Sequence, residues 1–240
     1  MNDYCAIAVL VFGLLVCLAA FGSGEEASES KALLARVDHL VLGTPDLDAG
    51  IQEVWRRLGV RATPGGSHPA WGTRNALIAL GEETYLEILA PDTQQPAPRG
   101  GRPLGLDEMG APRLVTWAAK GSELEEFVRG ARGRGVEPGQ VSSGSRRRPD
   151  GVLLTWKLTD FTKLRGDGLV PFFIDWGETP HPASTSAKGC RLVGLRGEHP
   201  RPEEARKMLR AMGVALPVSA GPSPALVATI LAPRGTVELR

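Results

Sequence analysis

The stretch Val37-Asp38-His39-Leu40-Val41-Leu42 decides the fold, because it begins a pattern that occurs three times in the chain. Its nearly unbroken apolar run is typical of a strand covered on both faces. A helical stretch follows and ends at Leu58-Gly59-Val60. The same succession runs through residues 114–136 and again through residues 191–214. A repeat of this kind indicates the fold before any single motif is considered.

Each repeat is predicted to form a strand, a helix and three further strands. In the first repeat, Thr44-Pro45-Asp46 carries the signals that begin a helix, and Gly59 carries the signal that ends one. The later strands of this repeat are expected at residues 60–63, 75–80 and 84–90. We therefore predict an α+β protein of repeated β-α-β-β-β modules, the third one abbreviated. The modules are expected at about residues 35–91, 113–177 and 190–240.

The beginning of the chain has the composition of a targeting segment. The run from Ala6 to Phe21 is apolar and uncharged, which fits the core of a secretory signal better than a membrane span of about 20 residues. We expect residues 1–24 to be a signal peptide or membrane-targeting segment and residues 25–34 to be a flexible linker. Because no Lys or Arg precedes the apolar run, an uncleaved anchor stays open. The expected location is exported, periplasmic or secreted, with membrane anchoring as the alternative.

Composition argues against several functional classes. The formal net charge is +1 and 5% of the residues are aromatic, so neither a basic surface nor a stacking platform for nucleic acid is indicated. Without the first segment Cys190 is the one remaining thiol, which excludes an internal disulfide. No Gly-x-Ser-x-Gly motif occurs, so nucleophilic catalysis is unsupported. The expected partner is a small molecule, and a membrane would be contacted only through the N-terminal segment.

An acidic residue lies among hydrophobic residues on the last strand of each repeat. These acids are Glu87, Asp175 and Glu238. Their recurrence at the same place makes them candidate site residues, although a carboxylate on a half-exposed strand can also simply pair with an arginine.

Two other motifs are assigned no chemistry. Arg146-Arg147-Arg148 is expected to be a solvated part of the loop 137–150, because no aromatic residues are interleaved with it. Gly65-Gly66 is expected to be a turn, because its surroundings lack the spacing of a phosphate-binding loop.

With His39 on its first strand and Glu87 on its last, the first β-α-β-β-β unit resembles the vicinal oxygen chelate superfamily. Three longer segments are similar to the glyoxalase-like domain family within it. These segments run from Val37 to Val41, from Gly66 to Ala76 and from Ile174 to Pro182. The resemblance implies paired modules whose curled, half-open sheets surround a cleft. In metal-dependent members, residues from the first and last strands of two modules hold one divalent ion.

The resemblance also implies a candidate metal site for Zn, Fe, Ni or Mn, which imidazole and carboxylate ligands suit. His39 and Glu87 occupy the family's ligand positions in the first module. Asp175 is the predicted third ligand, with Glu238 as the alternative, and His181 could supply a fourth. The corresponding first-strand positions of the other two modules hold no good ligand, so a site without a metal stays open.

The predicted catalytic residues are Glu87 and Glu238, either of which could move a proton if it is not a metal ligand. The predicted substrate-binding residues are His68, Trp71, Arg74, Asn75 and His181. Within this set, Trp71 offers an apolar plate and Arg74 a fixed cation for an anionic or carbonyl group. His68 and His181 each precede a proline, which also fits a plain turn.

These features favour a glyoxalase-like small-molecule enzyme of the lyase, isomerase or dioxygenase type. The alternative is a metal-free protein of the same fold that binds or sequesters a small molecule. The two differ in whether the purified protein holds stoichiometric metal that His39→Ala removes.

Overall fold

The computed structural model describes residues 27–148 and 150–240. The predicted targeting segment, residues 1–24, lies outside the described residues. Residues 27–36 form a helix, where the sequence predicted a flexible linker through residue 34. Leu33 of this helix is 4% exposed and belongs to the main core, which gives the segment the apolar contact that a free linker lacks. None of the described helices is long and apolar enough to cross a membrane.

The first two repeats together build one sheet of eight strands. Its strands are β1 Val37–Gly43, β2 Thr63–His68, β3 Thr73–Ala79, β4 Tyr85–Pro91, β5 Arg113–Lys120, β6 Val141–Arg147, β7 Leu153–Thr159 and β8 Phe172–Asp175. They follow the order β2-β3-β4-β1-β5-β8-β7-β6, so each repeat supplies four neighbouring strands. The first strands β1 and β5 pair antiparallel at the centre, and each pairs in parallel with the last strand of its own repeat.

The two faces of β1 explain its unbroken apolar sequence. Leu40 and Leu42 belong to the main core, and Val41 belongs to a second core on the opposite face. Helix α2 (Leu47–Leu58) packs on the main core and begins where Asp46 accepts a hydrogen bond of 2.8 Å from the backbone N–H of Ala49. It ends at a glycine with a φ of 82°, as predicted. Helix α3 (Leu124–Gly133) holds the equivalent place in the second repeat.

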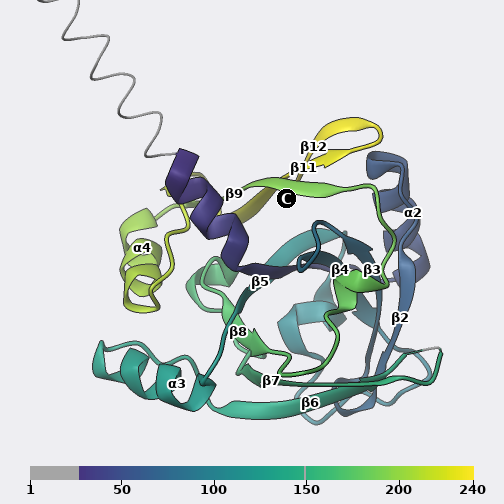
Figure 1. Ribbon diagram of the computed structural model, residues 1–240, viewed down its shortest axis with the longest axis horizontal. Coiled ribbons are helices and arrows are strands. Elements are labelled where there is room, and N and C mark those ends of the chain that lie inside the picture. The colour runs from purple at the N-terminus through teal and green to yellow at the C-terminus, as the bar shows by residue number, and fades with distance from the viewer. Residues whose placement is uncertain (1–26, 149) are drawn as a thin grey trace, which may run out of the picture.

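The large sheet curls until its two outer strands meet. Strands β2 and β6 stand at opposite ends of the strand order, yet the far end of β6 reaches β2 (Figure 1). Arg146 on β6 donates a hydrogen bond to the carbonyl of Gly65 on β2. A Cβ on Gly66 would lie 2.9 Å from the carbonyl oxygen of Arg147, so glycine is what lets the two edges approach. The sheet is therefore a nearly closed barrel.

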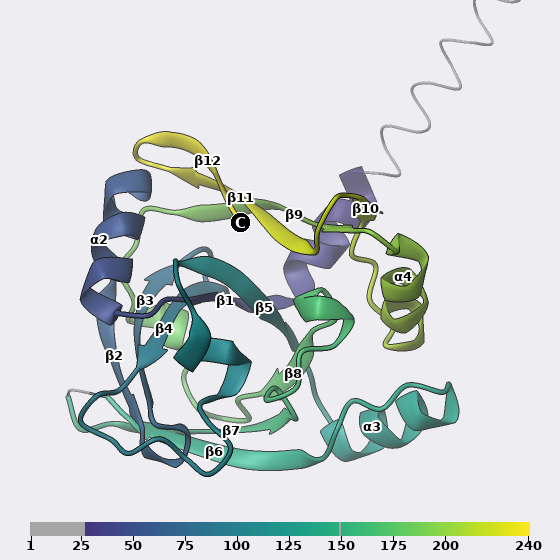
Figure 2. The same ribbon diagram turned by 180° about the vertical axis from the view of Figure 1, so that it is seen from behind.

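The third repeat has the same succession of elements but a different pairing. Its elements are β9 Arg191–His199, α4 Pro202–Ala211, β10 Val218–Ala220, β11 Ala225–Ala232 and β12 Gly235–Leu239. They form a separate sheet in the order β10-β9-β11-β12, in which β9 pairs in parallel with its second strand instead of its last. Figure 2 shows this small sheet lying across the large one. Backbone hydrogen bonds of 2.9 Å from Leu192 to Leu80 and from Leu114 to Arg240 join the two sheets.

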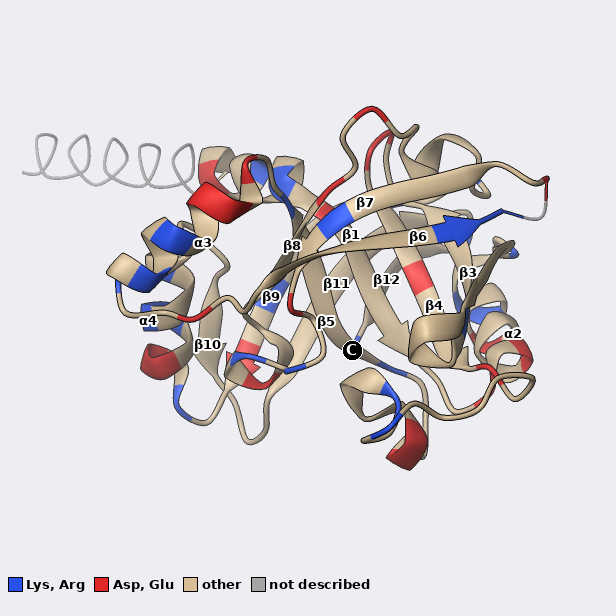
Figure 3. Ribbon diagram, turned by 90° about the horizontal axis from the view of Figure 1, so that it is seen from below, with Lys and Arg blue, Asp and Glu red and all other residues tan. Residues whose placement is uncertain are grey.

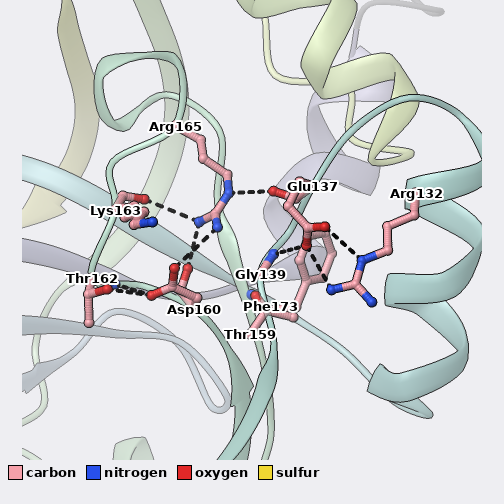
Figure 4. Close-up of polar contacts among 9 residues, drawn as sticks. All are labelled: Arg132, Glu137, Gly139, Thr159, Asp160, Thr162, Lys163, Arg165 and Phe173. Atoms are coloured by element: carbon pink, nitrogen blue, oxygen red, sulfur yellow. Dashed lines mark hydrogen bonds and ion pairs between the residues drawn. The ribbon is translucent and has the colours of Figure 1, made fainter.

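The α+β class and the curled sheet predicted from the sequence are confirmed, with local differences. The second strand lies at residues 63–68 and not at 60–63. The predicted loop 137–150 contains the strand β6. A polar network fixes the chain at one end of the β6–β7 pair, where the Arg165 guanidinium donates to the carbonyls of Glu137 and Asp160 at 2.8 and 2.6 Å (Figure 4). These bonds help to hold β6 as an ordered edge strand.

Candidate functional site

A narrow cavity lies on the concave side of the large sheet, between the two repeats. The cavity has a volume of ≈ 50 Å³, which is room for a few water molecules or a small organic group. Its walls are mostly aromatic and aliphatic, with a few polar groups, as is usual for small-molecule sites. The polar residues are His39, His68, Thr73, Asn75, Tyr85, Glu87 and Arg146, and the aromatic ones are Trp71, Trp156, Phe161, Phe172 and Trp176.

His39 and Asp38 form a buried pair at the base of this cavity. Neighbouring residues of a regular strand point to opposite faces, but β1 has a register shift at this point, where Val37 and His39 pair with consecutive residues of β5. The extra residue is Asp38, and its Oδ1 lies 2.7 Å from His39 Nδ1. Stacking on Tyr85, with ring centroids 4.6 Å apart, fixes the plane of the imidazole.

Asp38 is 1% exposed and is surrounded by donors. Burial alone would raise the pKa of Asp38, but hydrogen bonds from His181 and His39 and the charges of these two histidines outweigh it and lower the pKa to about 2. Trp176 Nε1 also donates to Asp38 Oδ2 at 3.1 Å. An ionised carboxylate can only accept hydrogen bonds, so the Nδ1 of His39 must carry the proton. The Nε2 of a neutral His39 is then a free acceptor facing the cavity.

Glu87 on β4 faces this free nitrogen. Its Oε2 lies 3.9 Å from His39 Nε2, and its Oε1 accepts a hydrogen bond of 2.5 Å from Asn75 Nδ2. The Asn75 Oδ1 is buried without a hydrogen-bond partner among the described residues. It lies over Gly65, where a Cβ would come within 2.0 Å of it. The Gly65-Gly66 pair is thus not the predicted turn but a bulged part of β2 that makes room for Asn75 and for Arg146.

Two further titratable side chains are kept neutral in the cavity wall. Burial lowers the pKa of His68 to about 4, with Glu87 opposing that shift and Arg146 adding to it. The Nδ1 of His68 lies 3.1 Å from Thr73 Oγ1. Burial also raises the pKa of Tyr85 well above its ordinary value, and the nearby charges of Asp38 and Glu87 raise it further.

Arg146 brings a cation into the cavity from the second repeat. The side chain is 5% exposed, in contrast to the solvated loop that was predicted for Arg146-Arg147-Arg148. Burial lowers the pKa of Arg146, while Tyr85 and Glu87 raise it, so these groups lie near the guanidinium. Figure 3 shows the basic residues at the arrowhead end of β6, the end that reaches β2. The prediction failed because the loop contains a strand whose alternation turns one arginine of three inward.

A family model described as a glyoxalase-like domain matches residues 37–213, which is more than half of the chain. The chain belongs to the glyoxalase-like domain family. The resemblance seen in the sequence is thereby confirmed, and the match covers the whole of the large sheet and the first part of the third repeat.

Several solved structures are similar to this chain at low sequence identity. A hypothetical protein from Staphylococcus aureus is 15% identical with a TM-score of 0.56, covering 84% of this chain and 83% of its own. A methylmalonyl-CoA epimerase from Mycobacterium tuberculosis is 19% identical with a TM-score of 0.40, covering 60% of this chain and 90% of its own. A hypothetical protein from Bacillus halodurans is 16% identical with a TM-score of 0.41, covering 60% and 96%. No curated protein matches the chain.

The cavity of this glyoxalase-like domain gathers five of the residues predicted from the sequence. They are His39, His68, Trp71, Asn75 and Glu87. His181 does not line the cavity but lies behind it, with its Nε2 3.3 Å from Asp38 Oδ2. Arg74 is also absent from the lining, because its neighbour Asn75 takes the inward position on β3.

Two predicted acids lie elsewhere. Asp175 follows Ile174, which lines the cavity, so strand alternation turns Asp175 to the other face, where it accepts a hydrogen bond from the Gly177 backbone. Glu238 lies on β12 of the small sheet, exposed and 3.4 Å from Arg196. The three acids recur in sequence, but only Glu87 reaches the cavity, because the third repeat pairs its strands differently.

The donor set does not fit a divalent metal. Within residues 27–148 and 150–240, no three or more His, Cys, Asp or Glu side chains are placed to hold one ion. His39 and Glu87 face each other, but the predicted third ligand Asp175 points away. The guanidinium of Arg146 shares the cavity, and its fixed positive charge opposes a second cation there.

Sequence reasoning missed several residues of the site, and three of these are titratable. Asp38 was quoted as part of the fold-deciding stretch, but the bulge that turns its carboxylate to His39 has no local signal. Tyr85 was a strand residue without a role. Arg146 did have a local signal for an inward-facing strand residue, because it lies two residues after Gly144 in an alternating polar stretch. A basic run is more often solvated, however.

Proposed function

We propose that this chain is a small-molecule enzyme of the lyase or isomerase type, in which His39 and Glu87 transfer a proton beside a carbonyl group. The observation that carries the proposal is the buried Asp38–His39 pair, whose free ring nitrogen faces Glu87 inside the cavity. Paired groups of this kind support general acid–base chemistry.

The role of His39 follows from its hydrogen bonds. Asp38 accepts the Nδ1 proton, which leaves the Nε2 lone pair as the base. When Nε2 takes a proton from the substrate, the imidazolium is stabilised by the carboxylate behind it. The same nitrogen can return the proton to a neighbouring atom of the substrate, so the reaction neither consumes nor releases a proton.

Glu87 supplies the second group. A gap of 3.9 Å separates its Oε2 from His39 Nε2, which is longer than a direct hydrogen bond. An exchangeable hydrogen of the substrate placed beside this gap would be within reach of both groups. Asn75 fixes the other carboxylate oxygen, so the side chain holds one orientation.

The test measures proton exchange without requiring the natural substrate. We expect the protein to accelerate deuterium uptake from D2O at the carbon next to the carbonyl in at least one member of a panel of small 2-oxo acids, hydroxy ketones and aldehydes, followed by NMR. His39→Asn and Glu87→Gln should each reduce the rate at least ten-fold, and Glu238→Gln should leave it unchanged. Exchange that persists in folded His39→Asn protein would refute the proposed role.

Metal content provides a second measurement on the same samples. We expect less than 0.1 equivalent, on the order of a trace, of Zn, Fe, Ni or Mn in purified protein and no loss of exchange with a chelator. One equivalent of metal that disappears in His39→Ala would support the metal site predicted from the sequence instead.

A metal-free binding protein is the second candidate function. The extensive aromatic lining favours it, because six Trp, Phe and Tyr side chains around a small volume suit retention of a ligand. This alternative gains if small ligands bind tightly to the wild type while no member of the panel shows deuterium uptake.

A further inference from the structure

The charge of Arg146 has no anionic partner in the cavity. The side chain is 5% exposed, and none of its nitrogens lies within 4.0 Å of a carboxylate oxygen in the part of the chain that the structure describes. A buried cation without a paired anion is costly to the folded state. The charge of Glu87 raises the pKa of Arg146, but the Glu87 Oε1 accepts a hydrogen bond from Asn75 and Glu87 forms no ion pair with Arg146.

The hydrogen-bonding capacity of the guanidinium is also largely unused. Nη1 donates to the Gly65 carbonyl, and no other side-chain hydrogen bond of Arg146 is found within residues 27–148 and 150–240. Three described side-chain polar atoms are fully buried without a hydrogen-bond partner, namely Arg74 Nε, Asn75 Oδ1 and Trp156 Nε1. The remaining nitrogens of Arg146 are not among these fully buried atoms. They therefore still touch open space, and the five N–H donors of arginine fit a carboxylate.

Arg146 lines two neighbouring pockets. Its side chain lines the cavity and also a separate groove on the outer surface, with Arg148, Thr185 and Ser186 on the groove walls. His39 and Glu87 line the same cavity as Arg146, and the Glu87 carboxylate would repel a second carboxylate placed beside it.

We propose that Arg146 is a carboxylate-binding subsite and that the ligand is a small carboxylic acid whose other end reaches His39 and Glu87. The volume of ≈ 50 Å³ limits such a ligand to a few heavy atoms beyond the carboxylate. That the bound acid is a substrate rests on the proposed function, whereas the binding itself does not. The subsite joins the repeats, because its cation comes from β6 and its neighbours come from β2 and β4.

The test compares carboxylates with their uncharged amides. Trp71, Trp156 and Trp176 line the cavity, so tryptophan fluorescence can report binding. Pyruvate, lactate and 2-oxobutyrate are titrated beside pyruvamide, lactamide and 2-oxobutyramide, with the wild type at pH 7. We expect at least one acid to bind ten-fold or more tightly than its amide. If every acid binds no better than its amide, or none binds, the proposal is overturned.

Matched variants assign that preference to one residue. Arg146→Met should remove it, and Arg147→Met should keep it, because Arg147 carries the same charge on the exposed face of the same strand. A preference that survives in Arg146→Met would overturn the proposal. Because Arg146 also joins β6 to β2, Arg146→Lys provides a variant that keeps the charge, and its preference should fall between the other two. The preference for acid over amide, which Arg146 sets, should persist in His39→Asn, so loss of exchange in that variant cannot be mistaken for failure of the subsite.

Discussion

Replacement of Asp38 by Asn tests the centre of the site most directly. The substitution preserves the shape of the side chain but removes the charge that accepts from His39, Trp176 and His181. The pKa of Asp38 is about 2 in the folded protein against 3.8 for the free group, and such a difference corresponds to about 2 kcal/mol of stabilisation. We therefore expect Asp38→Asn to lower the free energy of unfolding by about 2 kcal/mol at pH 7.

The pH dependence of that loss has a defined sign. Because the folded-state pKa of Asp38 lies below the unfolded value, its stabilisation is complete above pH 3.8 and disappears as the pH falls toward 2. Urea unfolding should give the same difference between wild type and variant at pH 7 and pH 5. The difference should narrow below pH 4. Asp175→Asn is the matched control, since Asp175 lies outside the cavity.

The same substitution should slow proton transfer. The amide of asparagine can donate to His39 Nδ1, which would place the ring proton on Nε2 and remove the base from the cavity. General acid–base catalysis contributes about 10²–10⁴ to a rate, so a loss in that range is expected in the deuterium-uptake assay. Wild-type exchange together with wild-type stability in Asp38→Asn would refute the reasoning.

Three further predictions follow from the same geometry. The pKa of His68 is about 4 in the folded protein and 6.5 in the unfolded chain, so the unfolded chain takes up a proton first as the pH falls. The free energy of unfolding should therefore fall by up to about 3 kcal/mol from pH 6.5 to pH 4, and urea unfolding of His68→Gln should show a smaller fall. Glu87→Gln should slow exchange at least ten-fold without abolishing acid binding, which fluorescence titration checks against Glu238→Gln. Gly65→Ala would place a Cβ 2.0 Å from Asn75 Oδ1 and should cost about 1–3 kcal/mol, seen as a lower melting temperature.

Local patterns were sufficient to predict the elements of the first repeat and most of its contribution to the cavity. His39 and Glu87 lie on neighbouring strands within one module, and Asn75 lies on the next strand, so strand alternation alone brings them to one face. The helix ends at the glycine that the sequence indicated. These residues lie within one module, whose strand and helix periods the sequence shows directly.

The remaining site residues depend on long-range geometry that no local pattern encodes. Arg146 enters the cavity because the sheet curls until β6 meets β2, which lie 81 residues apart at the contact with Gly65. Asp38 reaches His39 through a bulge in one strand. Asp175 was assigned to the wrong face by a single residue, and a shift of one residue reverses the face of every side chain in a strand.

The charged groups of the cavity come from different repeats, so ligand binding depends on closure of the barrel. The first repeat supplies the base His39 and the carboxylate Glu87, and the second repeat supplies the cation Arg146 from the strand that closes the sheet. A change that separates β6 from β2 should therefore weaken acid binding and proton transfer together, whereas a change at His39 should affect transfer alone. A substitution at Gly66 should weaken both acid binding and proton transfer, because its Cβ would lie 3.2 Å from the Cδ of Arg146 and 2.9 Å from the carbonyl oxygen of Arg147 on β6. Neither repeat alone holds the base, the carboxylate and the cation, so the complete site forms only when the barrel is closed.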